Sequence, residues 1–435
     1  MANSWFPVWR PVGHTHGTVA PDERLPFGQT LLMGAQHTVA MFGSTVLAPL
    51  LMGFDPNLAI LMSGIGTLLF FLVVGGRVPS YLGSSFGFIG VVNAVTGYAG
   101  HGALPDIGTA LGGIAVCGAL CVLAGLLVMV AGTRWIEAAM PPVVTGAVVA
   151  VIGLNLAPVA VRSVSASAFE SWTALMTVLC VGGVAVFARG AWQRLLILLG
   201  LLLAYALYAV LSNGLSLGQP VDFAAVAQAP WFGLPPFVAP RFAPHAVLMI
   251  APVAIILIAE NLGHIKAVGA MAGRPLDAYI GRAFVGDGLA TLLSSTAGGT
   301  GVTTYAENIG VMAVTRVYST LVFVAAAAIA VAFGLSPKFG ALIRTIPAPV
   351  LGGTSIVVFG LIAVSGARIW IENKVDFAQN RNLIVAAVTL ILGAGDFTVH
   401  LGGFAFGGIG TATFGAILLN LLLSRNARPT GPGAH

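Results

Sequence analysis

The hydrophobic pattern of the chain is a series of long apolar runs that follow one another from residue 27 onward. Each run approaches the ~20 residues that a helix needs to cross the hydrocarbon core of a bilayer. Pro, Gly and isolated charges separate the runs, which predict about fourteen membrane spans. The fold class we predict is therefore an all-α polytopic membrane protein.

Two of the runs, the third and the tenth of the series, are rich in Gly, Ser and Thr. They lie near residues 88 and 309. Both are too short or too broken to cross a bilayer as continuous helices. We expect each of them to consist of a short extended stretch followed by a half-helix, whose first N–H groups have no helical partner and suit a polar ligand.

The composition excludes a soluble enzyme. Of the 435 residues, 57% are hydrophobic and 8% are charged, against roughly a quarter charged in ordinary soluble domains. The net charge of +5 comes from scattered basic residues, so nucleic acid is not an expected partner. The cysteines Cys117, Cys121 and Cys180 lie in apolar runs without metal-ligand spacing; we expect packing roles and no metal site.

The basic residues indicate the orientation, because Lys and Arg near span ends favour the cytoplasmic side. With a cytoplasmic N-terminus and alternating spans, 15 of the 19 Lys and Arg residues fall inside. The four expected outside are Arg162, Arg241, Lys338 and Arg344. Residues 1–26 lack the apolar core of a signal peptide and are expected to form a cytoplasmic tail. Both termini are therefore expected in the cytoplasm.

The two halves of the chain resemble each other in three pairs of segments. The pairs are Ala35-Gln36-His37 with Ala259-Glu260-Asn261, Ser84-Ser85-Phe86 with Thr303-Thr304-Tyr305, and the segment from Pro142 with that from Pro349. Chance similarity is the alternative for any one pair, but all three occur in the same order. Each copy contains about seven spans, and a copy with an odd number of spans begins and ends on opposite sides of the membrane. The second copy therefore enters from the opposite face, which predicts a seven-plus-seven inverted repeat.

Two acids fall inside predicted spans. Glu260 lies deep in an apolar run, and Glu307 lies in the first turn of the second half-helix. An acid at the centre of a span costs at least ~2.5 kcal/mol, so a functional role is the default interpretation. A structural ion pair would need a basic partner, and only His264, one turn after Glu260, lies at similar depth. His37, beside Gln36, could equally well hydrogen-bond between helices.

A third motif, Gly83-Ser84-Ser85-Phe86-Gly87, fits the G-x-S-x-G nucleophile elbow of serine hydrolases. The elbow requires a strand, turn and helix in an α/β sheet, which this chain is not expected to form. A chain with 57 glycines also matches so short a pattern easily by chance. We therefore predict that the protein is not an enzyme.

These residues carry a family resemblance. The run Glu307-Asn308-Ile309-Gly310, followed by Thr315-Arg316, resembles the signature of the nucleobase/ascorbate transporter family, and Gln36-His37 resembles its first-span motif. The likeness extends over nearly the whole chain and is closest to the uracil permease branch. It implies a multi-pass protein of the bacterial inner membrane, often a homodimer, whose partners are the nucleobase and membrane lipid.

The resemblance also implies a division into domains. A core domain comprises residues 27–135 and 244–335, and a gate domain comprises residues 136–213 and 336–424. The segment 214–243 is an external linker, and residues 425–435 are a cytoplasmic tail.

The family's ligand contacts, carried over to this sequence, are implied at Phe86, Glu260, Tyr305, Ala306 and Glu307. His264 is implied close by. Gln36, His37, Asn261 and Asn308 are expected to support the site. Asn261 stands where the uracil permeases have His, and Ala306 stands where they have Gly. The added methyl at position 306 narrows the approach to the backbone N–H.

The function we expect is a proton-coupled symporter that imports uracil or a related pyrimidine, without a cofactor. Uracil carries two N–H donors and two carbonyl acceptors, which match carboxylates and half-helix N–H groups. Phe86 and Tyr305 could cover its ring. Glu260, in an apolar setting, is expected to carry the proton with His264 as relay, because N–H groups hold Glu307 ionised. A purine permease for xanthine or urate and an anion transporter of the same fold are the alternatives.

Overall fold

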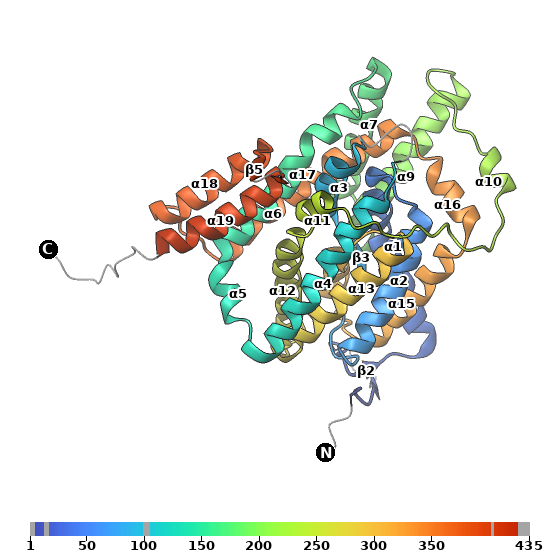
Figure 1. The fold of residues 1–435 in the computed structure, drawn as a ribbon. Helices are drawn as coiled ribbons and strands as arrows, with labels where there is room; N and C mark the ends of the chain where they lie inside the picture. Colours follow the sequence, from blue (N-terminus) through green and yellow to red (C-terminus); the bar gives the residue numbers. More distant parts are fainter. Residues whose placement is uncertain (1–4, 13–16, 99–104, 402–403, 425–435) are drawn as a thin grey trace. The chain divides into compact units, whose positions relative to one another are not determined.

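The structure, a computed structural model, describes residues 5–12, 17–98, 105–401 and 404–424. It is mostly helical, which confirms the predicted fold class (Figure 1). The tail predicted at 425–435 lies outside the described residues. The chain divides into two compact units, and the first comprises Met1–Gly132 and Ala157–Val358. The second comprises Thr133–Leu156 and Phe359–His435.

The first repeat lies in the first unit and begins with two long helices. Its elements are α1 (Phe27–Met52), α2 (Pro56–Val73), β3 (Leu82–Ser84), the 3₁₀ turn η1 (Phe86–Phe88), α3 (Ile89–Thr96) and α4 (Gly108–Ala131). Gly53 ends α1 in the left-handed conformation, with φ at 75°, which glycine adopts without a steric penalty. Asp55 then caps α2 by accepting a hydrogen bond of 3.0 Å from the N–H of Leu58.

The second repeat has the same order of elements and also lies in the first unit. Its elements are α11 (Pro244–Ile250), α12 (Val253–Met271), η3 (Asp277–Tyr279), α13 (Ile280–Ala297), β4 (Val302–Thr304), α14 (Ala306–Thr315) and α15 (Thr320–Gly334). Each repeat therefore contains a three-residue strand followed by a short helix, at the two places where the sequence predicts a broken span.

The remaining elements connect or follow the two repeats. Those of the first unit are β1 (Arg10–Pro11), β2 (Glu23–Arg24), α7 (Ala168–Phe187), α8 (Ala191–Arg194), α9 (Leu196–Ala209), the π-helical turn η2 (Val210–Gly214), α10 (Ala224–Gln228) and α16 (Pro337–Arg344). Those of the second unit are α5 (Arg134–Ala139), α18 (Asn380–Ala394), β5 (Val399–Leu401), β6 (Phe404–Phe406) and α19 (Gly408–Ser424). The helices α6 (Pro142–Arg162) and α17 (Ala348–Glu372) begin in one unit and end in the other.

Eight helical segments of the described residues are long and apolar enough to cross a membrane. A ninth is possible if α15 and α16, which are bent by 79° at their junction, form one span. Three further apolar helices, Phe86–Thr96, α18 and α19, are shorter. The chain is thus a multi-pass membrane protein, while the number of about fourteen spans stays a prediction.

Four helices of the first unit stand in a row, α4 beside α13, α13 beside α2, and α2 beside α15 (Figure 1). Glycines bring α4 and α13 close, since a Cβ at Gly288 would lie 2.6 Å from the carbonyl oxygen of Gly118. The pair α2 and α15 is equally close, because a Cβ at Gly64 would lie 2.7 Å from the carbonyl oxygen of Ala327. Small residues are the usual means of close helix packing in membranes, where the hydrophobic effect does not drive association.

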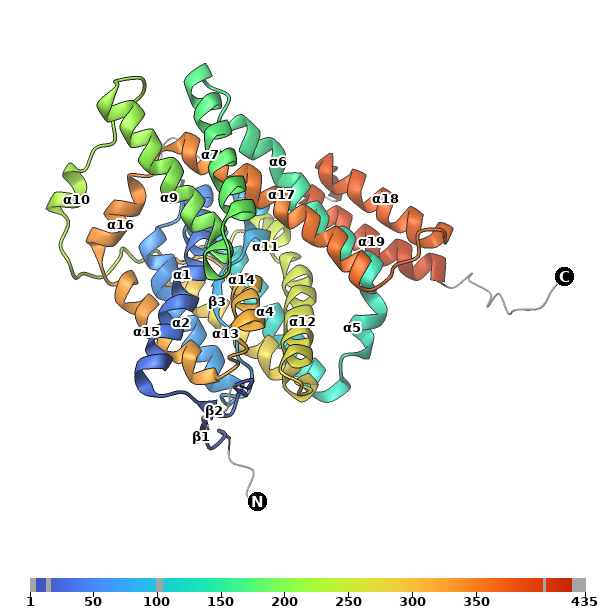
Figure 2. The ribbon, with the colours of Figure 1, turned by 180° about the vertical axis from the view of Figure 1, so that it is seen from behind.

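This packing repeats itself in the two copies. In chain order α2 corresponds to α13 and α4 to α15, so the contact of α4 with α13 has its counterpart in that of α15 with α2. The contacts of α1 with β3 and with α15 likewise correspond to those of α12 with β4 and with α4. The helices α1, α15, α12 and α4 are labelled in Figure 2. The tertiary contacts therefore support the repeat that three short sequence matches predict.

The described part of the predicted N-terminal tail folds back onto the first unit. The indole of Trp5 donates a hydrogen bond of 2.8 Å to the carbonyl oxygen of Leu72, and the indole of Trp9 donates one of 3.0 Å to Thr320. Asp22 forms an ion pair of 2.6 Å with Arg274. Indole donors with partners of this kind anchor aromatic residues where one end is apolar and the other polar.

Candidate ligand site at the crossed half-spans

The two broken spans meet as a short antiparallel pair of strands. β3 pairs with β4 in the register Leu82 with Thr304, Gly83 with Thr303 and Ser84 with Val302. The ladder extends by one bond at each end, from the N–H of Tyr305 to the carbonyl of Tyr81 and from the N–H of Ser85 to that of Gly301. The expectation of an extended stretch followed by a half-helix is therefore confirmed.

The register of this pair corrects the alignment of the two repeats by one residue. A local two-fold axis passes between Gly83 and Thr303, so Ser84 corresponds to Thr304 and Phe86 to Ala306. The three-residue matches in the sequence instead paired Phe86 with Tyr305. Similar residue types, hydroxyl then aromatic, produced that shift, whereas the hydrogen bonds of the backbone determine the true register.

One threonine of each repeat forms a hydrogen bond with the first residue of the strand in the same repeat, from the helix that precedes that strand. The hydroxyl of Thr67, on α2, accepts a hydrogen bond of 2.9 Å from the N–H of Leu82. The hydroxyl of Thr291, on α13, accepts one of 3.1 Å from the N–H of Val302, which is the corresponding residue of the second repeat. Both strand ends are thus satisfied without water, as a backbone inside a membrane requires.

Both half-helices begin at the crossing, where their first N–H groups have no helical partner. Ser85 caps η1 by accepting a hydrogen bond of 3.2 Å from the N–H of Gly87. Tyr305, at the start of α14, provides no side-chain cap. The N–H of Ala306 at the start of α14 is thus suited to an acceptor atom from outside the helix, while the N–H of Glu307 donates to the carboxyl group of the same residue.

The two predicted acids come from different elements that meet here. Glu260 lies on α12, which contacts η1, β4 and α14, and Glu307 lies in the first turn of α14. Both side chains are half-buried, and they are close enough to repel each other as carboxylates. No ion pair in the described part of the chain involves either acid. A basic partner, the structural alternative, is thus not found there.

Neutral groups surround these acids. The hydroxyl of Ser44, on α1, donates a hydrogen bond to Oε1 of Glu307. His264, one turn after Glu260 on α12, is half-buried, and its Nδ1 lies 2.9 Å from the hydroxyl of Thr304. α12 therefore brings an acid and an imidazole to the same strand crossing, as the spacing of four residues predicts.

His37 and Asn308 form a buried contact between α1 and α14. The amide Nδ2 of Asn308 lies 3.0 Å from Nδ1 of His37 and donates a hydrogen bond of 3.1 Å to the carbonyl oxygen of His37. The His37 ring also packs on Phe323, with 4.6 Å between ring centroids. Gln36 is half-buried beside it on α1. The two helices of the site are thus joined by the residues that the sequence suggests as support.

Tyr305 joins the two half-spans. Its hydroxyl donates a hydrogen bond of 2.7 Å to the carbonyl oxygen of Ser84 and lies 3.3 Å from the hydroxyl of Thr45. Its ring packs directly over Gly83, and only 4% of the residue is exposed. Its expected contact with the face of a ligand stays a prediction, while its contact with β3 is a feature of the fold.

Exposure separates the predicted residues into two groups. The accessible group is half-buried or exposed, and it comprises Gln36, Phe86, Glu260, His264, Ala306 and Glu307. The buried group comprises His37, Asn261, Tyr305 and Asn308. Asn261, with 1% of its surface exposed, lies close to Asp287 on α13. The accessible group is the one that can contact a ligand directly.

The sequence analysis missed a third acid in the interior of the first unit. Asp287 lies on α13 with 1% of its surface exposed, and its Oδ1 has no hydrogen-bond partner among the described residues. It lies close to Glu260, Asn261 and the backbone of Thr304. The rule that singled out Glu260, an acid inside a span, applies equally to Asp287 and could have found it.

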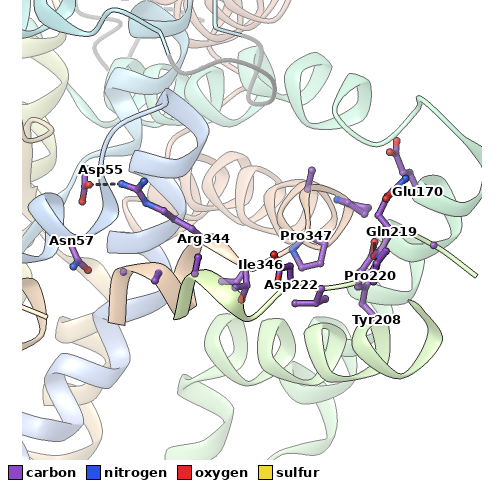
Figure 3. Close-up of a pocket in the computed structure, with 18 of the residues that line it drawn as sticks. Asp55, Asn57, Glu170, Tyr208, Gln219, Pro220, Asp222, Arg344, Ile346 and Pro347 are labelled. Carbon is purple, nitrogen blue, oxygen red and sulfur yellow. Dashed lines mark hydrogen bonds and ion pairs between the residues drawn. The ribbon is translucent and has the colours of Figure 1, made fainter. Parts of the chain in front are cut away.

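A separate cavity of about 980 Å³ lies in the first unit, among the ends of α2, α7, α9 and α17 with α10 and α16 (Figure 3). Asp55 and Arg344 form an ion pair at one end, and Glu170 and Asp222 lie farther along it (Figure 3). None of the predicted site residues lines this cavity. We place the candidate site at the crossed half-spans, because the two half-buried acids and the start of a half-helix without a side-chain cap occur there.

Comparisons with known proteins are consistent with this geometry. The family model Xan_ur_permease, described as "Permease family", matches residues 28–402. RutG of Escherichia coli (strain K12), named as a candidate pyrimidine permease, is 69% identical over 98% of this chain and 97% of its own. The uracil permease of Paenibacillus larvae is 42% identical over 93% of this chain and 96% of its own.

Solved structures of low sequence similarity share the fold. The transmembrane domain of the cyanobacterial bicarbonate transporter BicA superposes with a TM-score of 0.60 at 14% identity, covering 90% of this chain and 96% of that domain. The murine anion transporter Slc26a9, in its inward-facing state, superposes with a TM-score of 0.64 at 11% identity, covering 92% of this chain and 68% of that protein. Both are inverted-repeat transporters, which agrees with the contacts of the two repeats.

Proposed function

The chain belongs to the Xan_ur_permease family of nucleobase/ascorbate transporters, and from this membership we propose that it imports uracil or a related pyrimidine base together with protons. Relatives named as pyrimidine and uracil permeases cover nearly the whole chain. The coarser conclusion, a membrane transporter of nucleobases, follows from the family. The substrate, the coupling ion and the mechanism are the proposal.

One observation carries the choice of substrate: two acids and two half-helix starts meet at one crossing. Glu260 and Glu307 offer acceptors for ring N–H groups, and the N–H of Ala306 offers a donor for a ring carbonyl. Hydrogen bonds to carboxylates are roughly twice as strong as neutral ones. Uracil carries this set of donors and acceptors on a flat ring, against which Phe86 can stack.

Glu260 is the group that we assign to proton coupling. A neutral substrate needs a driving ion for accumulation, and a protonated Glu260 removes its repulsion with Glu307. At Glu307, hydrogen bonds from Ser44 and from the backbone at the start of α14 stabilise the charged form of the carboxyl group. His264, four residues after Glu260, is placed to relay the proton.

Alternating access would move the predicted core domain, residues 27–135 and 244–335, against the predicted gate domain. In the known transporters with inverted repeats, a substrate site at the repeat interface is exposed to each side in turn. The pairing of β3 with β4, one strand from each repeat, supports a site at that interface. We further propose that the protein works as a homodimer in the bacterial inner membrane, with both termini in the cytoplasm.

An anion transporter of the same fold is the second candidate, because the free N–H groups of a half-helix suit an anion. Two neighbouring acids disfavour it, since an anion would be repelled by both carboxylates. A purine permease for xanthine or urate would use the same donors and acceptors. Asn261 and Ala306 depart from the uracil permease pattern. The test therefore includes a purine as a competing substrate.

A competition assay distinguishes these candidates. Radiolabelled uracil is first bound to the purified protein in proteoliposomes. Unlabelled uracil, thymine, xanthine or sulfate is then added in excess. We expect uracil to displace the label, and xanthine and sulfate to leave it bound. Displacement by xanthine would indicate a purine permease, and displacement by sulfate an anion transporter.

The same assay tests the site. We expect Glu260→Ala and Glu307→Ala each to abolish uracil binding while the protein stays folded. Glu307→Ala removes the acceptor of a charge-assisted hydrogen bond, and Glu260→Ala removes an acceptor oxygen that the protonated acid still offers. Glu170→Ala, an acid in the separate cavity, is the matched control and should bind normally. Wild-type affinity in either site variant would refute the assignment of that acid.

A further inference from the structure

One serine of α1 contacts an acid of the site from outside both half-spans. Ser44 is 1% exposed, and its hydroxyl donates a hydrogen bond to Oε1 of Glu307, 263 residues away in the chain. Building on the proposed function, we propose that Ser44 is a positioning residue, which holds the Glu307 carboxylate in the orientation that accepts an N–H group of the nucleobase.

The direction of this hydrogen bond is unusual for a serine inside a helix. Hydroxyls in helices commonly donate to the carbonyl three or four residues earlier in the same helix. Thr96, on α3, does so with a hydrogen bond of 2.9 Å to Val92. Thr38, also on α1, does so with one of 3.0 Å to Gly34, and its hydroxyl also lies 3.1 Å from the carbonyl oxygen of Ala326 on α15. Ser44 donates to a side chain of another element instead. Its hydroxyl therefore contacts a residue of the site rather than the backbone of its own helix.

The next residue of α1 supports the same interpretation. The hydroxyl of Thr45 lies 3.3 Å from the hydroxyl of Tyr305 and 3.0 Å from the sulfur of Met41. Ser44 and Thr45 thus contact the two residues that flank Ala306, whose N–H is the proposed carbonyl donor. α1 consequently contacts the Tyr305 hydroxyl on one side of that donor and the Glu307 carboxylate on the other.

The chemistry explains why such a contact affects affinity. A carboxylate has two oxygens, and Ser44 occupies one of them, which leaves Oε2 of Glu307 for the ligand. A glutamate side chain loses conformational entropy when it is held in one rotamer. If the side chain is still mobile in the free protein, this loss occurs on ligand binding and lowers the affinity. A side chain already held by Ser44 avoids this loss.

The test compares three variants of the full-length protein in proteoliposomes. We expect Ser44→Ala to raise the KM for uracil roughly 10- to 100-fold, the range for a lost hydrogen bond to a charged group, with the maximal rate nearly unchanged. Ser44→Thr keeps the hydroxyl and should restore most of the affinity. Thr38→Val removes a buried hydroxyl of the same helix that does not contact Glu307, and it should leave KM unchanged.

Two results would overturn the proposal: a wild-type KM in Ser44→Ala, or a fall in maximal rate at constant KM. A Ser44→Ala protein that fails to fold would show a lowered thermal midpoint, and Ser44→Cys then replaces it, because a thiol is a weaker hydrogen-bond donor than a hydroxyl. A positioning role predicts a KM for Ser44→Cys well above that of Ser44→Thr, and a wild-type KM in Ser44→Cys overturns the proposal. Absence of any uracil binding by the wild-type protein would instead refute the proposed function, so the two failures are distinguishable.

Discussion

At the scale of single residues, the two acids of the site have different surroundings. Glu307 receives a hydrogen bond from Ser44 and lies at the start of α14, where the helix dipole favours negative charge. Glu260 lies in the middle of α12, and its carboxyl group has no hydrogen bond to another described residue. Titratable groups with such unequal environments commonly divide the tasks of a site between them. This asymmetry is the physical reason for assigning the proton to Glu260.

The assignment predicts the behaviour of Glu260→Gln. The amide resembles the protonated acid, so the variant should keep appreciable uracil binding and counterflow exchange but lose accumulation driven by a proton gradient. Uptake into proteoliposomes is measured with an imposed pH difference and, separately, with a sodium gradient. Glu170→Gln, which changes an acid outside the site, is the control and should accumulate uracil normally.

Two outcomes would contradict this mechanism. One is accumulation of uracil by Glu260→Gln under a proton gradient. The other is uptake by the wild-type protein that follows sodium and ignores pH, which would assign the coupling to another ion.

At the scale of elements, the site depends on two strands of three residues each that cross inside the membrane. Such strands are too short to be stable alone. They persist because Thr67 and Thr291 clamp them from behind and because the Tyr305 hydroxyl bonds to the backbone of β3. The helices around the crossing therefore stabilise it, and the paired strands determine where the two half-helices begin.

A methyl group at the centre of the crossing is expected to disturb both stability and binding. A Cβ at Gly83 would lie 2.5 Å from the Tyr305 ring and 2.7 Å from the hydroxyl of Thr45. Gly83→Ala should therefore cost roughly 1–3 kcal/mol of stability, the usual range for overpacking. It should also weaken uracil binding, because Tyr305 directly precedes Ala306. Thermal unfolding in detergent and equilibrium uracil binding measure the two effects.

Gly182→Ala is the matched control, since a Cβ at Gly182, on α7, meets nothing within 4 Å. It should leave the thermal midpoint and the affinity as they are in the wild type. If Gly83→Ala behaves like this control, the crossing is looser than the contacts of Tyr305 indicate.

At the scale of the whole molecule, the orientation in the membrane follows from charge. Of the 19 Lys and Arg residues, 15 fall on one side under the predicted topology, and that side is expected to be cytoplasmic. The segment between α9 and α11 lies on the opposite side under the same topology. It contains an exposed serine, Ser216, in the left-handed conformation with φ at 53°.

Cysteine labelling tests this orientation. Ser216→Cys should react with a membrane-impermeant thiol reagent in intact cells, because the segment faces outward. Asn373→Cys, an exposed position after α17, is expected inside and should react only after permeabilisation. The native cysteines Cys117, Cys121 and Cys180 are buried, which limits background reaction. The reverse labelling pattern would invert the topology.

The sequence by itself determined the features that depend on composition and local pattern. A chain with 57% hydrophobic and 8% charged residues must place most of its surface in lipid. Small polar residues interrupted two spans, and acids inside apolar runs marked Glu260 and Glu307, since an ionisable group in a membrane is too costly to keep without a role. Each of these inferences needs only a residue and its neighbours in the chain.

Only the tertiary structure decided which distant residues meet. The register of β3 and β4 depends on backbone hydrogen bonds, which a match of side-chain types cannot locate to one residue. The partnership of Ser44 with Glu307, the burial of Tyr305 and the position of Asp287 beside Asn261 all join segments far apart in the chain. Such contacts arise from the packing of helices against one another, and packing depends on all the surfaces that meet rather than on any single segment.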